Sequence, residues 1–240
     1  IDKVLPKKIK NDILGWKNKP KLEFFVDFET VTDIDDDFSN FPYRGSNSLI
    51  FMIGCGYEKS DGNWEMEVFT SKHLTIEEEI KIVDKWINYM RNVTDKILGK
   101  DSKIPNVYHW THAEKTFLKK AIANRKTISP ENLEECPSIP WSDFCEVARA
   151  APIVVKGAFG FGLKAIAKNL KRHELIETDW TDGPGDGLGA MVGAWYCNQI
   201  VKERNEPMIS LDYMKGIEKY NRVDCKVMWE IINYLRKKHI

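Results

Sequence analysis

The sequence predicts an α/β domain of three layers, in which helices cover both faces of a mixed central sheet. Three features indicate this fold class. Apolar and alternating runs dominate positions 22–70, a strand–helix unit follows near position 110, and helical patterns fill the second half. This order fits a three-layer domain better than a barrel or a bundle. A chain of 240 residues is long enough for one such domain with a well-buried core.

The first strands form a meander in our interpretation. Residues 22–28 are almost continuously apolar, which is typical of a strand buried on both faces of a sheet. Residues 48–57 predict a second strand, and residues 64–68 alternate between apolar and acidic side chains like a half-exposed third strand. The Asp-Gly-Asn at 61–63 supplies the turn between these last two, so we expect antiparallel pairing.

Helical patterns begin at Thr75, where Thr75 and Glu78 form a capping box ahead of an apolar stripe. A short strand at 106–110 then precedes a second helix. Ser142 is the expected cap of a third, and Gly216 is expected to break or bend the last one. The later helices are predicted at 111–125, 142–150, 163–170, 188–201 and 212–238.

The composition excludes few functions. Lys+Arg and Asp+Glu both number 36, so a nucleic-acid partner is neither implied nor excluded. No apolar run is long enough to span a bilayer, and no signal-peptide pattern opens the chain, so no membrane partner is expected. Five scattered cysteines without a Cys-x-x-Cys pair predict reduced thiols in a cytoplasmic compartment and argue against a structural zinc site.

The N-terminal segment is rich in lysine. Residues 1–21 contain seven lysines and two aspartates. We interpret residues 1–20 as a basic lead-in or linker and residues 21–240 as the domain; a backbone-binding arm is the alternative. The first residue is Ile1 rather than methionine, which suggests a piece of a longer protein.

Two acids interrupt the first apolar strand. Asp27 and Glu29 are two residues apart, so on a strand their side chains face the same side. Their mutual repulsion in apolar surroundings calls for a cation, and hard cations such as Mg²⁺ prefer oxygen ligands. The alternative is a strand end with two exposed acids.

Two further groups carry polar chemistry. Tyr220 and Asp224 are four residues apart and share one face of a helix, where they could also be an ordinary pair at its edge. His109 and Glu114 lie where a strand ends and a helix begins. Zinc is disfavoured there because the spacing is not that of a zinc motif, and Glu114 could simply complement the helix dipole.

Taken together, these motifs resemble the DEDD exonuclease superfamily, the DnaQ-like enzymes with a ribonuclease H-like fold. An early Asp-x-Glu, a central acid and a late Tyr-x-x-x-Asp occur in that order, and the tyrosine marks the DEDDy subgroup. The resemblance spans residues 22–235. Within this superfamily the chain most resembles the YprB-type ribonuclease H-like domain, which is often fused behind a RecB/Cas4-like nuclease domain.

The resemblance implies a two-metal 3′–5′ exonuclease acting on DNA or RNA, with a single-stranded 3′ end as the expected substrate. Asp27, Glu29 and Asp224 would hold the first Mg²⁺ or Mn²⁺, Asp27 would share the second ion with Glu114, and Tyr220 would orient the attacking water. Glu114 is longer than the usual aspartate, which puts the second ion in doubt.

Candidate substrate contacts lie near these motifs. Lys164 and Lys168 share a helical face that Lys171 and Arg172 extend, although a solvated face is the ordinary interpretation. His109 belongs to the same candidate set. Trp110, standing where many relatives carry asparagine, is expected either to stack on a base or to pack. Phe159 and Phe161 are further candidates for stacking, with core packing as the ordinary interpretation.

Some patterns are set aside. The glycine-rich segment 181–189 lacks the ending of a phosphate-binding loop, and the acids of 33–37 lack the glycine and glutamate of a calcium-binding loop. Both are expected to be connections. Asp143 and Asp212 are expected to cap helices rather than to bind metal.

Two rival functions remain open at this point. One is a nucleic-acid-binding module that keeps the fold without catalysis, which Glu114 and the neutral net charge would suit. The other is an endonuclease of ribonuclease H type that cuts RNA in hybrids. Tyr220 weighs against the endonuclease.

Overall fold

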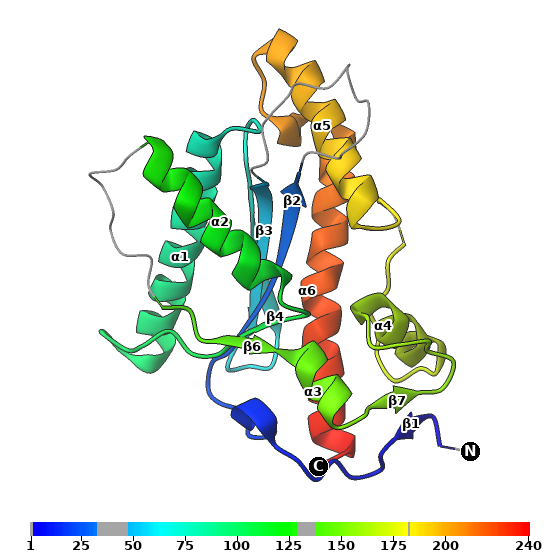
Figure 1. Cartoon of the computed structure of the whole chain (residues 1–240). Coiled ribbons are helices and arrows are strands. Elements are labelled where there is room, and N and C mark those ends of the chain that lie inside the picture. Colours follow the sequence, from blue (N-terminus) through cyan, green and yellow to red (C-terminus); the bar gives the residue numbers. More distant parts are fainter. Residues whose placement is uncertain (1, 33–47, 129–137, 182) are drawn as a thin grey trace.

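A mixed sheet of five strands forms the centre of the molecule (Figure 1). The computed structural model describes residues 2–32, 48–128, 138–181 and 183–240. The sheet order is β4-β3-β2-β5-β6, so the strand carrying the Asp-x-Glu motif lies in the middle. Its strands are β2 (Phe24–Val31), β3 (Leu49–Glu58), β4 (Trp64–Thr70), β5 (Val107–His109) and β6 (Trp141–Asp143).

The meander expected from the sequence is confirmed. β2 pairs antiparallel with β3 and β3 with β4, whereas β2 pairs parallel with β5 and β5 with β6. The turn between β3 and β4 is closed by a hydrogen bond of 2.8 Å from the Lys59 amide to the Asn63 carbonyl. Gly62 adopts a φ of 83° within it, a conformation that suits glycine.

Helices cover both faces of this sheet (Figure 1). On one face Phe24, Val26 and Phe28 pack against the first two helices. On the other face Phe25 packs with the C-terminal helix. A three-layer α/β arrangement is therefore present. The helices are α1 (Ile76–Leu98), α2 (Ala113–Ile128), α3 (Phe144–Ala150), α4 (Leu163–Arg172), α5 (Gly187–Arg204) and α6 (Asp212–Lys238), with 3₁₀ turns η1 (Ile13–Gly15) and η2 (Met208–Ser210).

Helix caps partly follow the sequence. The Thr75 hydroxyl accepts a hydrogen bond of 3.3 Å from the Glu78 amide, as a capping box requires. The cap of α3 is Asp143, which accepts from the Cys145 amide at 2.8 Å, whereas Ser142 lies within β6. Asp212 does not cap α6; it lies in the first turn, paired with Lys215 at 2.8 Å.

The expected interruption at Gly216 is wrong. α6 continues through this residue as one helix of 27 residues. The backbone of α6 at this point packs against Gly183. Gly183, with a φ of 108°, lies so close that a Cβ on it would be 2.8 Å from the Gly216 carbonyl oxygen. The segment around Gly183 is a connection, as expected, and it ends where Asp186 caps α5.

The N-terminal segment is not a separate lead-in, which corrects the interpretation of residues 1–20. Val4, Ile9 and Trp16 are buried and belong to the core that α6 completes. The Ile9 amide donates to the His239 carbonyl at 2.8 Å. β1 (Val4–Leu5) also pairs with β7 (Val154–Val155). Although lysines dominate the composition of this segment, the burial of these three apolar side chains attaches it to the domain.

Three further expectations concern the cysteines, membrane-spanning helices and the acidic run at 33–37. The four cysteines that the structure describes are free and buried, as expected for reduced thiols. Over the described ranges, no helix combines the length and the apolar character that crossing a membrane requires. The acidic run at 33–37 lies outside the described residues.

Gly54 yields a first prediction, because it lies opposite Asp27 in the sheet where α6 crosses. A Cβ there would lie 2.1 Å from Asn221 Oδ1 and 2.9 Å from Cys225 Sγ. We expect Gly54→Ala to lower the free energy of unfolding by about 1–3 kcal/mol through overpacking. Urea denaturation measures the change.

Gly187→Ala is the matched control. Its added methyl group would meet nothing within 4 Å at the first residue of α5. The control should be as stable as the wild type. Equal stability of both variants would contradict the close approach of α6 to the sheet.

Candidate metal centre

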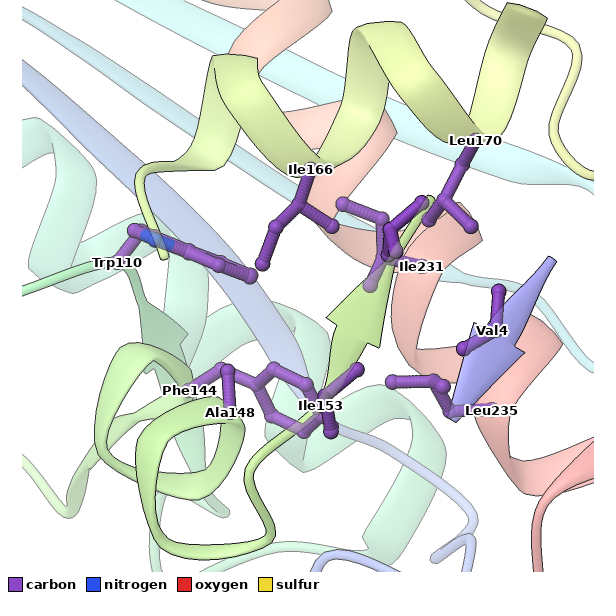
Figure 2. Close-up of a pocket in the computed structure, with 10 residues that line it drawn as sticks. Val4, Trp110, Phe144, Ala148, Ile153, Ile166, Leu170, Ile231 and Leu235 are labelled. Carbon is purple, nitrogen blue, oxygen red and sulfur yellow. The ribbon is translucent and has the colours of Figure 1, made fainter. Parts of the chain in front are cut away.

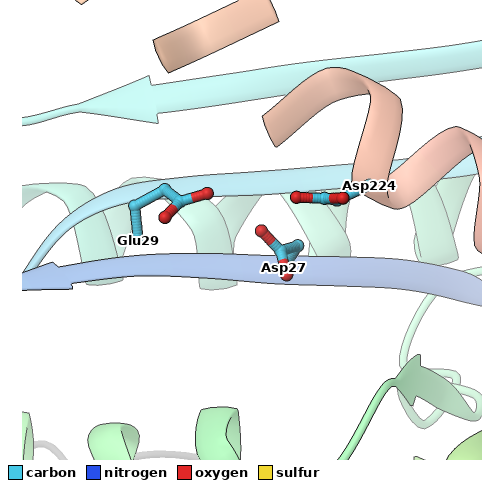
Figure 3. Close-up of side chains that lie close together, drawn as sticks. All are labelled: Asp27, Glu29 and Asp224. Atoms are coloured by element: carbon cyan, nitrogen blue, oxygen red, sulfur yellow. The ribbon is translucent and has the colours of Figure 1, made fainter. Parts of the chain in front are cut away.

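Three carboxylates from the two ends of the chain converge between β2 and α6 (Figure 3). Each of Asp27, Glu29 and Asp224 has a carboxylate oxygen within 4.8 Å of a carboxylate oxygen of the other two. Asp27 and Glu29 project from the α6 face of β2 because alternate residues of a strand share a face. Asp224 reaches them from the helix. The structure thus brings together three of the four acids in the expected site.

The close crossing of α6 over the sheet makes this convergence possible. Gly54 in β3 leaves room for Asn221 and Cys225 of the helix. The fully buried Asn221 side chain donates to Asp27 Oδ2 at 2.8 Å and to the Asp27 carbonyl at 3.1 Å. Asn221 is a site residue that sequence reasoning missed. Its position three residues before Asp224, on the same helical face, was the available signal.

Burial makes the three negative charges unfavourable. Glu29 and Asp224 are each 5% exposed. Desolvation, followed by the charge of Asp224, raises the pKa of Glu29 to about 8. Desolvation raises the pKa of Asp224 to about 7, although Lys164 and a hydrogen bond from Trp180 oppose it. The pKa of Asp27 is also well above its usual value, because of burial and then Asp224 and Glu29.

The donor set suits a hard divalent cation. It consists of carboxylate oxygens, without thiol or imidazole, which is the ligand type that Mg²⁺ and Mn²⁺ prefer. A cation at this point would relieve the repulsion that otherwise makes the carboxyl groups retain protons. Among the residues that the structure describes, this is the one group of three or more potential ligands that lie this close together.

Asp224 is surrounded by aromatic and cationic side chains. Trp180 Nε1 donates to Asp224 Oδ1 at 3.0 Å, a contact from a loop that sequence reasoning missed. Tyr220 lies one turn before Asp224 on the same helical face, and its side chain opposes the rise in the pKa of the Asp224 carboxyl. Lys164 Nζ lies 4.2 Å from the centroid of the Tyr220 ring and donates to the Gly185 carbonyl at 2.6 Å. Lys164 therefore lies beside the acids, at a position from which the expected contact with a substrate stays a prediction.

Glu114 occupies a different position. Its carboxylate Oε2 lies 3.1 Å from His109 Nδ1, and both side chains are buried. It is not among the three acids whose oxygens meet, but its charge contributes to the raised pKa of Asp27 and of Asp224. Burial raises the pKa of Glu114, and His109 opposes the shift. Glu114 thus borders the group while being held by His109.

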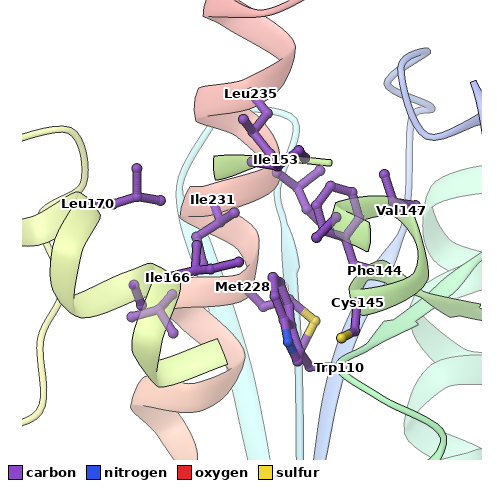
Figure 4. Packing of buried hydrophobic residues seen from close by; sticks show 14 of the residues in the cluster. Trp110, Phe144, Cys145, Val147, Ile153, Ile166, Leu170, Met228, Ile231 and Leu235 are labelled. Carbon is purple, nitrogen blue, oxygen red and sulfur yellow. The ribbon is translucent and has the colours of Figure 1, made fainter. Parts of the chain in front are cut away.

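His109 and Trp110 are both buried, which disfavours the substrate contacts expected of them and leaves packing, the other expectation for Trp110. His109 is buried between Glu114 and the Trp141 ring, whose centroid is 5.1 Å away. Trp110 Nε1 donates to the Phe161 carbonyl at 2.8 Å. The Trp110 ring lines a small apolar pocket (Figure 2) and belongs to the larger core cluster shown in Figure 4. It packs rather than stacks on a base.

The chain was compared with protein-family models, with curated proteins and with solved structures, and nothing matched in any of the three. The geometry of the site is therefore the basis for any functional conclusion.

The raised pKa values predict how stability depends on pH. The folded pKa of Glu29, about 8, exceeds its ordinary value of 4.5, and the folded pKa of Asp224, about 7, exceeds its ordinary value of 3.8. Their stabilising contribution is complete below the unfolded values and is lost as pH rises through the folded values. The metal-free protein should therefore lose stability between about pH 4 and pH 8.

Glu29→Gln should flatten this loss, because it removes one of the repelling charges. At pH 8 without metal, a gain of about 1 kcal/mol would raise Tm by about 2–4 °C. Scanning calorimetry across the pH range measures it, with Glu67→Gln on the exposed side of β4 as control. Parallel Tm profiles for Glu29→Gln and wild type would count against the buried repulsion.

Proposed function

We propose that this chain is a metal-dependent 3′–5′ exonuclease of the DEDDy type, with a ribonuclease H-like fold. The observation that carries the proposal is the convergence of Asp27, Glu29 and Asp224, with Tyr220 one turn before Asp224 on α6. The mixed sheet with helices on both faces supports it, since the resemblance implies this architecture.

In this proposal the carboxylates bind the metal ions, and neighbouring side chains orient the carboxylates. Asp27, Glu29 and Asp224 would hold the first Mg²⁺ or Mn²⁺, and Asp27 and Glu114 the second. Bound ions of this kind supply an activated water and stabilise the charge on the leaving oxygen of a phosphodiester. Asn221 fixes the Asp27 carboxylate, and Trp180 fixes that of Asp224, so both acids are oriented before substrate arrives.

Tyr220 is the proposed orienting group for the water. Burial, and after it the charges of Asp224, Glu29 and Asp27, raise the pKa of the Tyr220 phenol, which places this side chain beside the carboxylates. Lys164 over the Tyr220 ring adds a cation on the side of the site that α4 borders. This cation is suited to a phosphate oxygen of the scissile group. The product would be a nucleoside 5′-monophosphate released from a 3′ end.

The setting of the activity belongs to the same proposal. The substrate would be DNA or RNA with a single-stranded 3′ end, and the domain would serve a larger nucleic-acid-processing protein, with an upstream nuclease domain as a candidate partner. A cytoplasmic compartment suits the free, buried cysteines.

A second candidate function is favoured by one observation. His109 engages one oxygen of Glu114, so a nucleic-acid-binding module with an incomplete second ion site fits the same fold. Calorimetric titration with Mn²⁺ separates the two functions. Failure to bind Mn²⁺ at millimolar concentration would favour the module.

Cleavage assays test the exonuclease directly. With Mg²⁺ or Mn²⁺, a 5′-labelled single strand should shorten stepwise from its 3′ end, and a circular strand should persist. Asp27→Ala should abolish cleavage, and Tyr220→Phe should lower kcat by about 10²–10⁴-fold, the usual contribution of a group that assists proton transfer.

Asp212→Asn is the matched control, because this exposed acid lies on the same helix and pairs with Lys215. It should cleave like the wild type. Equal activity of wild type and Asp27→Ala would reject the proposed reaction.

A further inference from the structure

A strip of basic side chains runs along α4 from the carboxylate site. The α4 strip consists of Lys164, Lys168 and Arg172, which are four residues apart and therefore share one helical face. The sequence of α4, LKAIAKNLKR, contains no acidic residue. A rise of 1.5 Å per residue places the ends of the strip about 12 Å apart along the helix.

The strip has one end inside the site. Lys164 Nζ lies 4.2 Å from the centroid of the Tyr220 ring, and its charge lowers the repulsion on Asp224. Lys168 and Arg172 then lead away from the acids along the helix. A nucleic-acid strand with one phosphate at the carboxylates could therefore place its next phosphates along the strip.

The outer two cations are free to bind. Lys168 and Arg172 are exposed. Across the part of the chain that the structure describes, neither side chain has a hydrogen bond or an ion pair within the protein. By contrast, Lys171 on the neighbouring side of α4 donates to the Glu177 carbonyl at 2.6 Å. Two unpaired cations on a shared face match the regular charge of a phosphate backbone.

An exposed aromatic ring precedes the strip. Phe159 is 98% exposed, in the loop that leads into α4. The loop is anchored nearby, because the Phe161 carbonyl accepts from Trp110 Nε1 at 2.8 Å and the Phe161 side chain packs on the core. The fold thus separates the two phenylalanines, and Phe159 presents an uncovered face. Single-strand binding proteins use such faces to stack bases.

We propose that the α4 strip and Phe159 together form a track that binds single-stranded nucleic acid on the 5′ side of the scissile bond. This inference rests on the proposed function, because an exonuclease leaves only one nucleotide on the 3′ side. The strip is too long for that side: its length of about 12 Å exceeds the 3.4 Å per nucleotide of one strand in B-form DNA. Contacts to phosphates and stacking would make binding independent of sequence.

Binding isotherms test the track without cleavage. The probe is a 5′-labelled oligothymidylate of about 12 nucleotides, within the range that such proteins cover, titrated in Ca²⁺ at several salt concentrations. Each lost phosphate contact lowers the salt slope by about 0.7, so Lys168→Ala/Arg172→Ala should lower its magnitude by about 1.4. Phe159→Ala should raise Kd by at least about five-fold, and Phe159→Tyr should restore it.

Lys85→Ala/Lys119→Ala is the matched control. Both lysines are exposed, on α1 and α2, which cover the other face of the sheet. The control should keep the wild-type slope and Kd. If the control and the α4 double variant have equal slopes, the track is rejected.

Cleavage separates failure of the track from failure of the proposed function. The α4 double variant should lower the ratio of kcat/KM for the strand to kcat/KM for the p-nitrophenyl ester of thymidine 5′-monophosphate, which is too short to follow α4. An unchanged ratio in a cleaving enzyme overturns the track. If the wild type cleaves neither substrate, the proposed function fails, and the salt slopes alone decide the track.

Discussion

The repulsion among three buried carboxylates is the constraint on which the site depends. Asp27, Glu29 and Asp224 lie within 4.8 Å of one another at the layer between sheet and helix. Left to itself, such a group would separate or move toward water. It is held because β2 is the central strand of the sheet and α6 is packed over it by two apolar clusters. The surrounding core therefore stabilises an arrangement that its own charges oppose.

Neutral contacts orient the acids but do not neutralise them. Asn221 and Trp180 donate hydrogen bonds to Asp27 and Asp224. Lys164 is the cation whose charge most favours ionised Asp224. One ammonium group, which also donates to the Gly185 carbonyl, does not balance three carboxylates. Protons or a divalent ion must supply the rest, and only the ion leaves the carboxylate oxygens available as ligands near neutral pH.

Local patterns predicted the parts of the site that depend on a single element. The period of a strand placed Asp27 and Glu29 on one face, and the period of a helix did the same for Tyr220 and Asp224. Asn221 was missed because an amide in a helix has no chemical signature until its partner is known. The burial of His109, and the choice between stacking and packing for Trp110, could not be decided from sequence for a related reason. Trp110 packs with residues of α3 and α4 and His109 with Trp141, all of which lie more than 30 residues away in sequence.

The N-terminal segment and Gly216 show the same limit in the fold. Lysines dominate the composition of the first twenty residues, but burial of Val4, Ile9 and Trp16 against distant helices decides their place. Helix propensity alone makes Gly216 a weak point, whereas tertiary packing of α6 overrides it. In both cases the deciding contact joins residues far apart in the chain.

The two proposed ion positions differ in the ligands that the fold provides. The first would draw on three acids that the crossing of β2 and α6 brings together. The second would rely on Asp27 and on Glu114, one oxygen of which already lies 3.1 Å from His109. An imidazole that holds a carboxylate fixes its orientation, as outer partners of metal ligands do, but it also competes for its charge. The first ion should therefore bind more tightly than the second, because more uncompensated negative charge converges on its position.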